Sequence, residues 1–417
     1  MKEWVIDGGK ELSGVIEVGG AKNSLVAILP ACIVSKSIVK LSNVTPLFDT
    51  YVIIDILKKL NVRVIYDNKS KMIIDARNVK NCDLTSKEMT DIRASYYFMG
   101  ALLSLYKNVS ILGPGGCKFA TRPIDLHLFA FECLGCKCEI EKGVYKFKKD
   151  KINNRIIKFS KVSVGATVNT ILASCRIKGK VRLVNVALEP EIDDLITFLN
   201  KCGANIIREE NDIVIKGVER LHGCEHEIME DRIEAGTYLI LGACIGNNLK
   251  IVYHESKYLS TLIELLQSMK VNIKIRNDYM IVNKCTNIEN QKVVFDCYPN
   301  LATDLQQPLS ILLTHTNRVS VLKDLVYPSR YTQIDDLNKM GFRMEVINEC
   351  LYVYRSENLC GQRVSCKDLR GGMSLVIAGL IAKGETYISN VCHIERGYYN
   401  VISKLKRIGA KIYEKDM

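Results

Sequence analysis

One pattern that recurs six times along the chain constrains its fold more than any other feature. In each copy, an amphipathic helical stretch ends in a small or polar turn, and a short apolar run typical of a strand follows. The copies lie about 70 residues apart, at residues 57–64, 134–138, 201–206, 268–273, 339–344 and 407–412. Self-similarity at a fixed period predicts six copies of one supersecondary unit.

The third copy gives the order of the elements within a unit. The sequence predicts strand, helix, strand, helix, strand and strand over residues 161–164, 167–173, 180–184, 191–199, 204–208 and 212–216. The last two strands close the unit as a hairpin. Because helices alternate with strands, the pattern indicates the α/β class.

The two ends of the chain are expected to lie in one domain. The sixth unit ends near Tyr413 without a last strand, and the N-terminal stretch 3–6 is suited to supply it. Three βαβαββ units over residues 21–227 then form a first domain. The other three, over residues 1–20 and 228–417, form a second domain that the N-terminal strand completes.

Composition narrows the class of protein. The chain has 417 residues, 47% of them hydrophobic and 25% charged, which is typical of a globular protein with sizeable cores. No run is as long as a membrane span, and the N-terminus lacks the apolar core of a signal peptide, so we expect a cytoplasmic protein. The 16 cysteines mostly sit in apolar patterns, as Cys32, Cys175 and Cys244 do, which predicts reduced core thiols.

A metal site is the alternative interpretation for one group of cysteines. Cys133, Cys136 and Cys138 form a C-x-x-C-x-C motif. Neither a second cluster nor a nearby pair of histidines completes a set of four ligands, so the sequence favours no metal.

The net charge of +12 is typical of a protein that binds a nucleic acid, an acidic surface or a polyanionic small substrate. No block of lysine and arginine with interleaved aromatic residues is present, as a nucleic-acid surface would require. The arginines stand singly beside turns, which favours a small polyanion. A non-catalytic protein that binds polyanions or nucleic acid is the alternative from another functional class.

Basic residues gather where the units predict the N-termini of helices. Such termini present N–H groups and the positive end of a dipole, and they bind anions. The acidic residues at these turns are explained by helix capping alone: Asp91, Asp231 and Asp368. A cation there opposes the dipole and indicates an anionic ligand. We interpret the turns of the two domains as the walls of a polyanion-binding cleft, lined by Lys22, Arg93, Arg122, Arg330, Arg370 and Arg396.

A glycine-rich loop carries a thiol within residues 113–127. Gly113, Gly115 and Gly116 make the loop adaptable, and Cys117 lies five residues before Arg122. A thiol at a loop tip beside cations can be reactive. The plainer interpretation is a surface turn that happens to hold a cysteine.

Together, these stretches resemble the enolpyruvyl transferases over the whole chain. The matching residues are 20–23, 93–95, 114–117, 122–127, 162–167, 189–192, 231–234, 303–304, 330, 368–370 and 396–398. The resemblance implies two inside-out α/β barrels, each with three βαβαββ repeats. Within the family, the chain is most similar to the branch that acts on UDP-N-acetylglucosamine in the first committed step of peptidoglycan synthesis.

The resemblance also implies a reaction and a site. The enolpyruvyl group of phosphoenolpyruvate passes to the 3'-hydroxyl of the UDP-sugar, and phosphate is released. Phosphoenolpyruvate is expected to contact Lys22, Asn23, Arg122, Arg330, Arg370 and Arg396. The nucleotide sugar is expected to contact Arg93, Arg122, Pro123, Ile124, Asp125, Leu126, Lys161, Val162, Ser163, Val164, Asp304 and Val326.

Addition to a double bond needs a proton donor and a base. By resemblance, Cys117 protonates the methylene carbon, Asp304 is the base at the hydroxyl, and Lys22 belongs to the catalytic set. The loop around Cys117 is expected to close over the substrates and exclude water. Because the arginines supply charge stabilisation, the reaction requires no metal. We also expect no cofactor and no obligate protein partner.

Three departures from the family pattern border the expected substrates. Ala120 stands where glycine is usual, residues 298–303 lack the usual Gly-Phe-Pro run, and Pro328 and Ser329 replace Glu-Asn. They leave the reaction class intact and bear on the acceptor. A related enzyme acting on 3-phosphoshikimate is the nearest alternative, but that branch has no matching cysteine loop.

Overall fold

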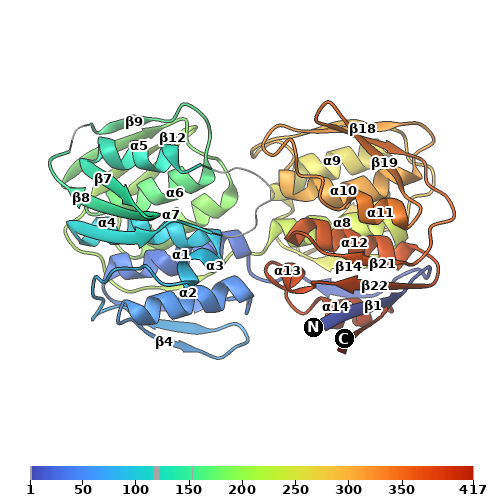
Figure 1. Cartoon of the computed structure of the whole chain (residues 1–417), viewed down its shortest axis with the longest axis horizontal. Helices are drawn as coiled ribbons and strands as arrows, with labels where there is room; N and C mark the ends of the chain where they lie inside the picture. Colours follow the sequence, from blue (N-terminus) through green and yellow to red (C-terminus); the bar gives the residue numbers. More distant parts are fainter. Residues whose placement is uncertain (1, 116–122, 153, 417) are drawn as a thin grey trace. The chain divides into compact units, whose positions relative to one another are not determined.

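The computed structural model describes residues 2–115, 123–152 and 154–416. The chain forms two compact units, one of residues 20–229 and the other of residues 1–19 with 230–417. They are named here the 20–229 unit and the 230–417 unit. The boundaries expected from the sequence are residues 21 and 227. Figure 1 labels the elements of each unit.

Within the described residues, the strands of the 20–229 unit form three sheets. The first has the order β13 (Glu225–Glu227), β3 (Ile38–Ser42), β5 (Met72–Asp75) and β4 (Arg63–Tyr66). The second has the order β6 (Asn108–Leu112), β8 (Val144–Lys149) and β7 (Cys136–Glu141). The third has the order β11 (Ile206–Glu209), β12 (Asp212–Gly217), β10 (Gly179–Val184) and β9 (Ile156–Lys158).

The 230–417 unit repeats this arrangement over its described residues. One sheet has the order β15 (Ile273–Ile275), β16 (Tyr279–Val282), β14 (Leu249–Val252) and β2 (Val15–Glu17). Another has the order β17 (Lys292–Phe295), β18 (Ser320–Asp324), β20 (Cys350–Tyr354) and β19 (Arg343–Ile347). A further sheet has the order β21 (Arg363–Ser365), β22 (Glu385–Ser389), β1 (Lys2–Asp7) and β23 (Lys411–Asp416).

One pairing pattern recurs in the four-stranded sheets. In the third sheet of the 20–229 unit, β9 runs parallel to β10, with Ile156 opposite Arg182, and β12 pairs antiparallel with both β10 and β11. In the sheet of β21 to β23, β1 lies antiparallel between β22 and β23, with Trp4 opposite Ile388 and Glu414. The strand β1 therefore takes the place of β12, and both ends of the chain lie in one sheet (Figure 1).

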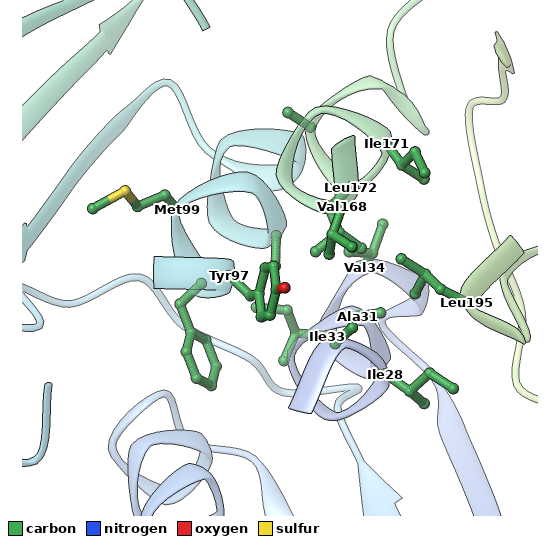
Figure 2. Close-up of a cluster of buried hydrophobic side chains, with 14 of the residues drawn as sticks. Ile28, Ala31, Ile33, Val34, Tyr97, Met99, Val168, Ile171, Leu172 and Leu195 are labelled. Carbon is green, nitrogen blue, oxygen red and sulfur yellow. The ribbon is translucent and has the colours of Figure 1, made fainter. Parts of the chain in front are cut away.

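Three helices form the interior of the 20–229 unit because they are apolar on all sides. They are α1 (Lys22–Ser35), α4 (Tyr97–Leu105) and α6 (Val164–Ser174). Every residue of α1 from Ser24 onward is buried. Figure 2 shows Val34 of α1 beside Leu172 of α6, with Tyr97 of α4 in the same buried cluster. The strands alternate buried and exposed residues, so each sheet covers these helices with one face.

The 230–417 unit has an equivalent interior. Its buried helices are α8 (Arg232–Ile245), α10 (Gln306–Leu312) and α12 (Leu369–Ile381). The other helices of the 20–229 unit are α2 (Phe48–Lys59), α3 (Glu88–Asp91), η1 (Arg93–Tyr96), α5 (Asp125–Cys133) and α7 (Pro190–Lys201). Those of the 230–417 unit are η2 (Ser256–Leu259), α9 (Ser260–Ser268), η3 (Thr303–Leu305), η4 (Leu313–His315), α11 (Ile334–Lys339), α13 (Cys392–Glu395) and α14 (Val401–Arg407).

One predicted strand is wrong. Residues 161–164 were expected to be the first strand of the third unit, but that strand is β9, several residues earlier. Ser163 instead caps α6, since its Oγ accepts a hydrogen bond from Ala166 N at 3.3 Å. The other predicted helices and strands of this unit are confirmed, within two or three residues at each end.

Two short strands take places that do not follow chain order. β13 pairs parallel with β3 although it comes after the third repeat, and β2 pairs parallel with β14 although it precedes the first repeat. In each unit, one sheet therefore includes a short strand from a distant part of the chain. The chain passes from one unit to the other after Gly19 and again after Met229. None of the helices in the described ranges has the length and apolarity needed to cross a membrane.

Candidate active site

Lys22 begins α1 in the 20–229 unit. Its Nζ lies 2.9 Å from Asp49 Oδ2, and both side chains are largely buried. Asp49 lies in the first turn of α2, where a carboxylate suits the helix dipole. The turn before α1 is tight, because a Cβ on Gly20 would lie 1.8 Å from the backbone oxygen of Asn43. This helix end therefore presents a fixed ammonium group beside Asn23, which is exposed.

A second carboxylate anchors the same helix end. Asp194 of α7 accepts hydrogen bonds from Ser24 Oγ, from His226 Nε2 at 2.9 Å and from Met229 N at 3.3 Å. Both the Asp194 and the His226 side chains are nearly buried. The first turn of α1 is thus held by α2 and by α7, which keeps Lys22 in one position.

Arg93 opens η1 and lies in an aromatic cluster. Its guanidinium carbon is 5.5 Å from the ring centre of Tyr96, and the Tyr96 and His127 ring centres are 4.8 Å apart. A Cβ on Gly165 would lie 2.6 Å from Tyr96 Oη and 2.9 Å from the His127 ring. The N-terminus of α6 therefore packs directly on this cluster, which brings η1, α5 and α6 together.

His127 is held neutral at the centre of the cluster. Gly100 N donates to Asn169 Oδ1 at 2.8 Å, so Asn169 Nδ2 is left to donate to His127 Nδ1 at 2.9 Å. The imidazole proton then resides on Nε2. Burial, with a smaller contribution from the charge of Arg93, lowers the pKa of His127 to about 3.

The segments expected to hold the nucleotide sugar adjoin these helix ends. Residues 123–126 lead into α5, and residues 161–164 lead into α6. Three of these side chains are exposed, namely Pro123, Asp125 and Lys161. Ile124 is buried, and the others, Leu126, Val162, Ser163 and Val164, are half-buried. Since His127 of α5 packs on Gly165 of α6, the two segments lie at the same end of the unit. Cys117, Ala120 and Arg122 lie outside the described residues.

Two buried arginines share one carboxylate in the 230–417 unit. Arg330 Nη1 donates to Asp304 Oδ1 at 2.7 Å, and Arg370 Nη2 donates to Asp304 Oδ2 at 3.0 Å. Burial alone would raise the pKa of Asp304, but the charges and hydrogen bonds of the two arginines outweigh it and hold this pKa far below its usual range. The structure therefore brings together three residues that the sequence predicted for the site.

Asp368 fixes the two arginines from the N-terminus of α12. Its Oδ1 accepts hydrogen bonds from Arg370 N at 3.0 Å and Gly371 N at 3.2 Å. Its Oδ2 accepts from Thr332 Oγ1 and from Gln307 Nε2, the latter at 3.2 Å. Arg330 Nη2 lies 3.7 Å from Asp368 Oδ1. Asp368 is thus both a helix cap and the residue that positions the Asp304 cluster.

Arg370 keeps donors available for a ligand. Its guanidinium carbon lies 5.1 Å from the ring centre of Tyr398, whose Oη is 2.7 Å from Thr237 Oγ1 of α8. Arg370 is 1% exposed, yet its Nε and Nη1 have no hydrogen-bond partner in the part of the chain that the structure describes. Buried donors are normally satisfied, so these N–H groups indicate a place for an acceptor with negative charge.

Val326 and Arg396 both belong to the 230–417 unit. Val326 N donates to Asp324 Oδ1 at 2.9 Å, and Asp324 also accepts from Thr303 Oγ1, one residue before Asp304. Arg396 was expected in the turn that opens the second helix of the sixth unit. It is the C-cap of the short helix α13 and so lies in the turn before α14, which starts at Val401.

No metal-binding group of three His, Cys, Asp or Glu side chains occurs among the described residues. In the C-x-x-C-x-C motif, Cys136 is buried, whereas Cys133 and Cys138 are half-buried. Cys32, Cys175 and Cys244 are buried, as the sequence predicted.

Comparison with known proteins settles the family. The family model for EPSP synthase (3-phosphoshikimate 1-carboxyvinyltransferase) matches residues 6–405. The chain belongs to the EPSP synthase family. Curated relatives of this family member include the UDP-N-acetylglucosamine 1-carboxyvinyltransferase 2 of Listeria monocytogenes, 43% identical over 98% of this chain and 96% of the relative. The protein of that name from Bacillus anthracis is 38% identical over 100% of this chain and 97% of the relative.

Solved structures support the same fold for this EPSP synthase family member. The enolpyruvyl transferase NikO from Streptomyces tendae superposes with a TM-score of 0.90 at 22% identity and covers 99% of each chain. An EPSP synthase from Acinetobacter baumannii gives a TM-score of 0.74 at 14% identity over 100% of each chain. The α/β fold that the resemblance implied is confirmed.

Sequence reasoning missed the residues that support the site in this EPSP synthase family member. Asp49 and Asp194 are acidic residues with little exposure, and both lie on amphipathic helices. An acidic residue on such a helix is the sequence signal that could have marked them as supporting residues. Gln307 sits in a run of otherwise mostly apolar residues and is buried. A buried polar group needs a partner, so such positions mark candidates for supporting residues.

Proposed function

We propose that the protein transfers the enolpyruvyl group of phosphoenolpyruvate to the 3'-hydroxyl of UDP-N-acetylglucosamine and releases phosphate. One observation carries the proposal. The Listeria monocytogenes protein named UDP-N-acetylglucosamine 1-carboxyvinyltransferase 2 is 43% identical over 98% of this chain. The reaction commits UDP-N-acetylglucosamine to peptidoglycan synthesis, takes place in the cytoplasm and contributes to cell wall formation and division. Each unit serves as one enolpyruvyl transferase domain of three repeats.

The charges of the substrates match the fixed cations. Phosphoenolpyruvate carries a phosphate and a carboxylate, for which planar guanidinium groups are suited. In this proposal it contacts Lys22, Asn23, Arg122, Arg330, Arg370 and Arg396. The nucleotide sugar contacts Arg93, residues 122–126, residues 161–164, Asp304 and Val326. The N–H groups of Arg370 that lack protein acceptors in the described chain support its share in this assignment.

Asp304 and the anionic substrate compete for the same two arginines. Without substrate, the carboxylate neutralises Arg330 and Arg370 and is a very weak base. When phosphoenolpyruvate takes over the guanidinium groups, Asp304 loses their charge stabilisation and its pKa rises. The carboxylate then accepts the proton of the 3'-hydroxyl. Binding of one substrate thus activates the base that acts on the other.

The second proton transfer involves Cys117. Its thiol donates a proton to the methylene carbon while the sugar oxygen bonds to the neighbouring carbon. Loss of a proton from the resulting methyl group then expels phosphate and restores the double bond. Lys22, held by Asp49 and by the anchored first turn of α1, stabilises the negative charge of the phosphate.

The test is phosphate release from phosphoenolpyruvate with each acceptor offered alone. We expect release with UDP-N-acetylglucosamine and none with 3-phosphoshikimate. Release with 3-phosphoshikimate only would establish the alternative acceptor. If no acceptor supports release and polyanion binding falls steeply with salt, the protein is a binding protein instead.

A covalent probe addresses Cys117. Fosfomycin is an epoxide that resembles phosphoenolpyruvate, and we expect it to inactivate the protein with a mass adduct on the tryptic peptide of Cys117. Protection by substrates should slow the inactivation. Absence of the adduct would remove Cys117 from the proposed mechanism.

A further inference from the structure

Two thiols lie in contact in the 20–229 unit, and no step of the proposed reaction uses them. Cys202 Sγ and Cys224 Sγ are 3.3 Å apart. Cys202 is buried and Cys224 is half-buried, so a reagent reaches the pair through Cys224. A disulfide has a sulfur–sulfur bond of about 2.05 Å, so the two atoms need to approach by only about 1 Å.

Backbone hydrogen bonds hold both cysteines in place. Cys202 ends α7, and its N donates to Phe198 O at 3.1 Å. His222 N donates to Cys202 O at 2.8 Å, which fastens the segment before β13 to the end of α7. Lys40 N donates to Cys224 O at 3.0 Å and ties the same segment to β3. The contact between the thiols is therefore set by the fold rather than by two mobile side chains.

The two thiols differ in the way that disulfide exchange requires. The hydrogen bond with Cys202 lowers the pKa of Cys224, and the charge of Lys201 adds to this effect against the opposing effect of burial. The same hydrogen bond, together with burial, raises the pKa of Cys202. The more accessible thiol is thus the better nucleophile, and the buried thiol remains protonated until a mixed disulfide forms.

We infer that Cys202 and Cys224 form a reversible redox site, oxidised to an intramolecular disulfide by a small disulfide such as oxidised glutathione. The Cys224 thiolate attacks one sulfur of that compound, and one glutathione thiolate leaves. Cys202 then loses its proton and attacks Cys224 Sγ, and the second glutathione leaves. Two protein thiols are oxidised and one disulfide is reduced, so the electrons balance.

The bond would secure the strand that completes the first sheet. It links the end of α7 to the segment that leads into β13, which pairs with β3. His226 of β13 donates to Asp194, which also holds Ser24 in the first turn of α1. Oxidation therefore stabilises the packing around the helix end that carries Lys22, without touching the residues proposed to contact substrate.

The experiment treats the full-length native protein with oxidised glutathione, blocks free thiols and maps tryptic peptides without reduction. We expect residues 202–208 and 221–232 as one disulfide-linked pair, which dithiothreitol separates. Closing this loop should raise Tm by about 5 °C or more. The Cys224→Ala variant should lose both effects, whereas Cys360→Ala, which removes an exposed thiol of the other unit, should retain them.

Two results would overturn the inference. One is glutathione that stays attached to Cys224 without forming the linked pair, since the second exchange step then fails. The other is a linked pair that forms only in denaturant, since the folded contact then plays no part. Because Cys224 is half-buried, Cys224→Ala should fold even if Cys202→Ala does not.

Discussion

His127 shows how one buried side chain ties the stability of the 20–229 unit to pH. Its Nδ1 accepts the hydrogen bond of Asn169, so protonation removes that bond and buries a charge. The folded pKa of about 3 lies below the unfolded value of 6.5, so stability is full above pH 6.5 and is lost as the pH falls toward 3. We expect a loss of about 2 kcal/mol between pH 7 and pH 5 from this residue, measurable by calorimetry.

The matched variants are His127→Gln and His222→Gln. Glutamine can accept the bond from Asn169 but cannot take up a proton in this pH range, so His127→Gln should lose less stability on acidification than wild type. His222 is exposed in the same unit, so His222→Gln should follow wild type. An equal pH dependence in all three proteins would contradict the account of His127.

Asp304→Asn separates the two roles of that carboxylate. As the proposed base, its loss should lower kcat about 10²-fold to 10⁴-fold. As the partner of Arg330 and Arg370, its loss leaves two buried cations facing each other and should destabilise the 230–417 unit by about 3 kcal/mol. Trp4 is the only tryptophan of the chain and is buried in this unit, so its fluorescence during urea unfolding reports the change.

Added phosphate should restore part of this stability. An anion bound to the two guanidinium groups replaces the missing carboxylate, so phosphate should stabilise Asp304→Asn more than wild type. Because the pKa of Asp304 is depressed, its contribution is present above about pH 4 and is lost at lower pH, where the variant and wild type should converge. Asp335→Asn changes an exposed carboxylate and is the control. Equal stabilisation of both proteins by phosphate would contradict the proposed exchange.

The residues of this cluster were predictable, but their pairing was not. Asp304, Arg330 and Arg370 followed from the family resemblance. Arg330 lies 26 residues after Asp304 along the chain, and Arg370 lies 66 residues after it. Such spacing carries no information on which arginine contacts which carboxylate. Whether a charged side chain at a turn is solvated or buried depends on tertiary packing, which is why the supporting role of Asp368 emerged only from its hydrogen bonds.

Elements with a strong period were predicted well, and short polar elements were not. The helix α7 and the hairpin of β11 and β12 have clear apolar patterns and lie close to the predicted positions. The prediction of a strand at 161–164 was wrong because the capping preference of Ser163 outweighed the strand propensity of Val162 and Val164. The strand β13 reads Glu-His-Glu, with only His226 buried, and three such residues give no detectable alternation.

The entry to the Cys117 loop depends on a glycine for steric reasons. A Cβ on Gly115 would lie 1.8 Å from the backbone oxygen of Thr90, so Gly115→Ala must displace one of the two segments. The loop that Gly115 enters carries the proposed proton donor, and Gly115 itself is only half-buried. We therefore expect kcat/KM to fall more than about tenfold, the scale of a misplaced catalytic group, with little change in Tm.

Gly113→Ala is the comparison for that variant. A Cβ on Gly113 would lie 3.0 Å from the Tyr145 ring, a side chain that can move, and 3.2 Å from the backbone oxygen of Gly143. This conflict is milder than the one at Gly115, so the loss of activity should be smaller. Fosfomycin labelling of Cys117 gives an independent measure of loop position. Unchanged turnover and labelling in Gly115→Ala would show that the entry of the loop does not set the position of Cys117.

At the scale of the whole molecule, the chain crosses between the two units after Gly19 and again after Met229, and both of its ends lie in the 230–417 unit. The repeat pattern indicated that the N-terminal strand completes the sixth sheet, because that unit lacked a strand. The pairing of β2 with β14 and of β13 with β3 was not predicted, because nothing in either three-residue strand shows that it pairs with a distant repeat. Each unit nevertheless has its own hydrophobic core.

Deleting residues 2–7 should therefore unfold the 230–417 unit and spare the other. Trp4, Val5 and Ile6 are buried, and at about 2 kcal/mol for each side chain their loss approaches the total stability of a domain, which is about 5–15 kcal/mol. The strands β22 and β23 also lose the neighbour that they share. Calorimetry should show the transition of the 20–229 unit retained and that of the 230–417 unit lost. Deleting residues 415–417 removes only the end of an edge strand and should retain both, so equal behaviour of the two truncations would contradict the central place of β1.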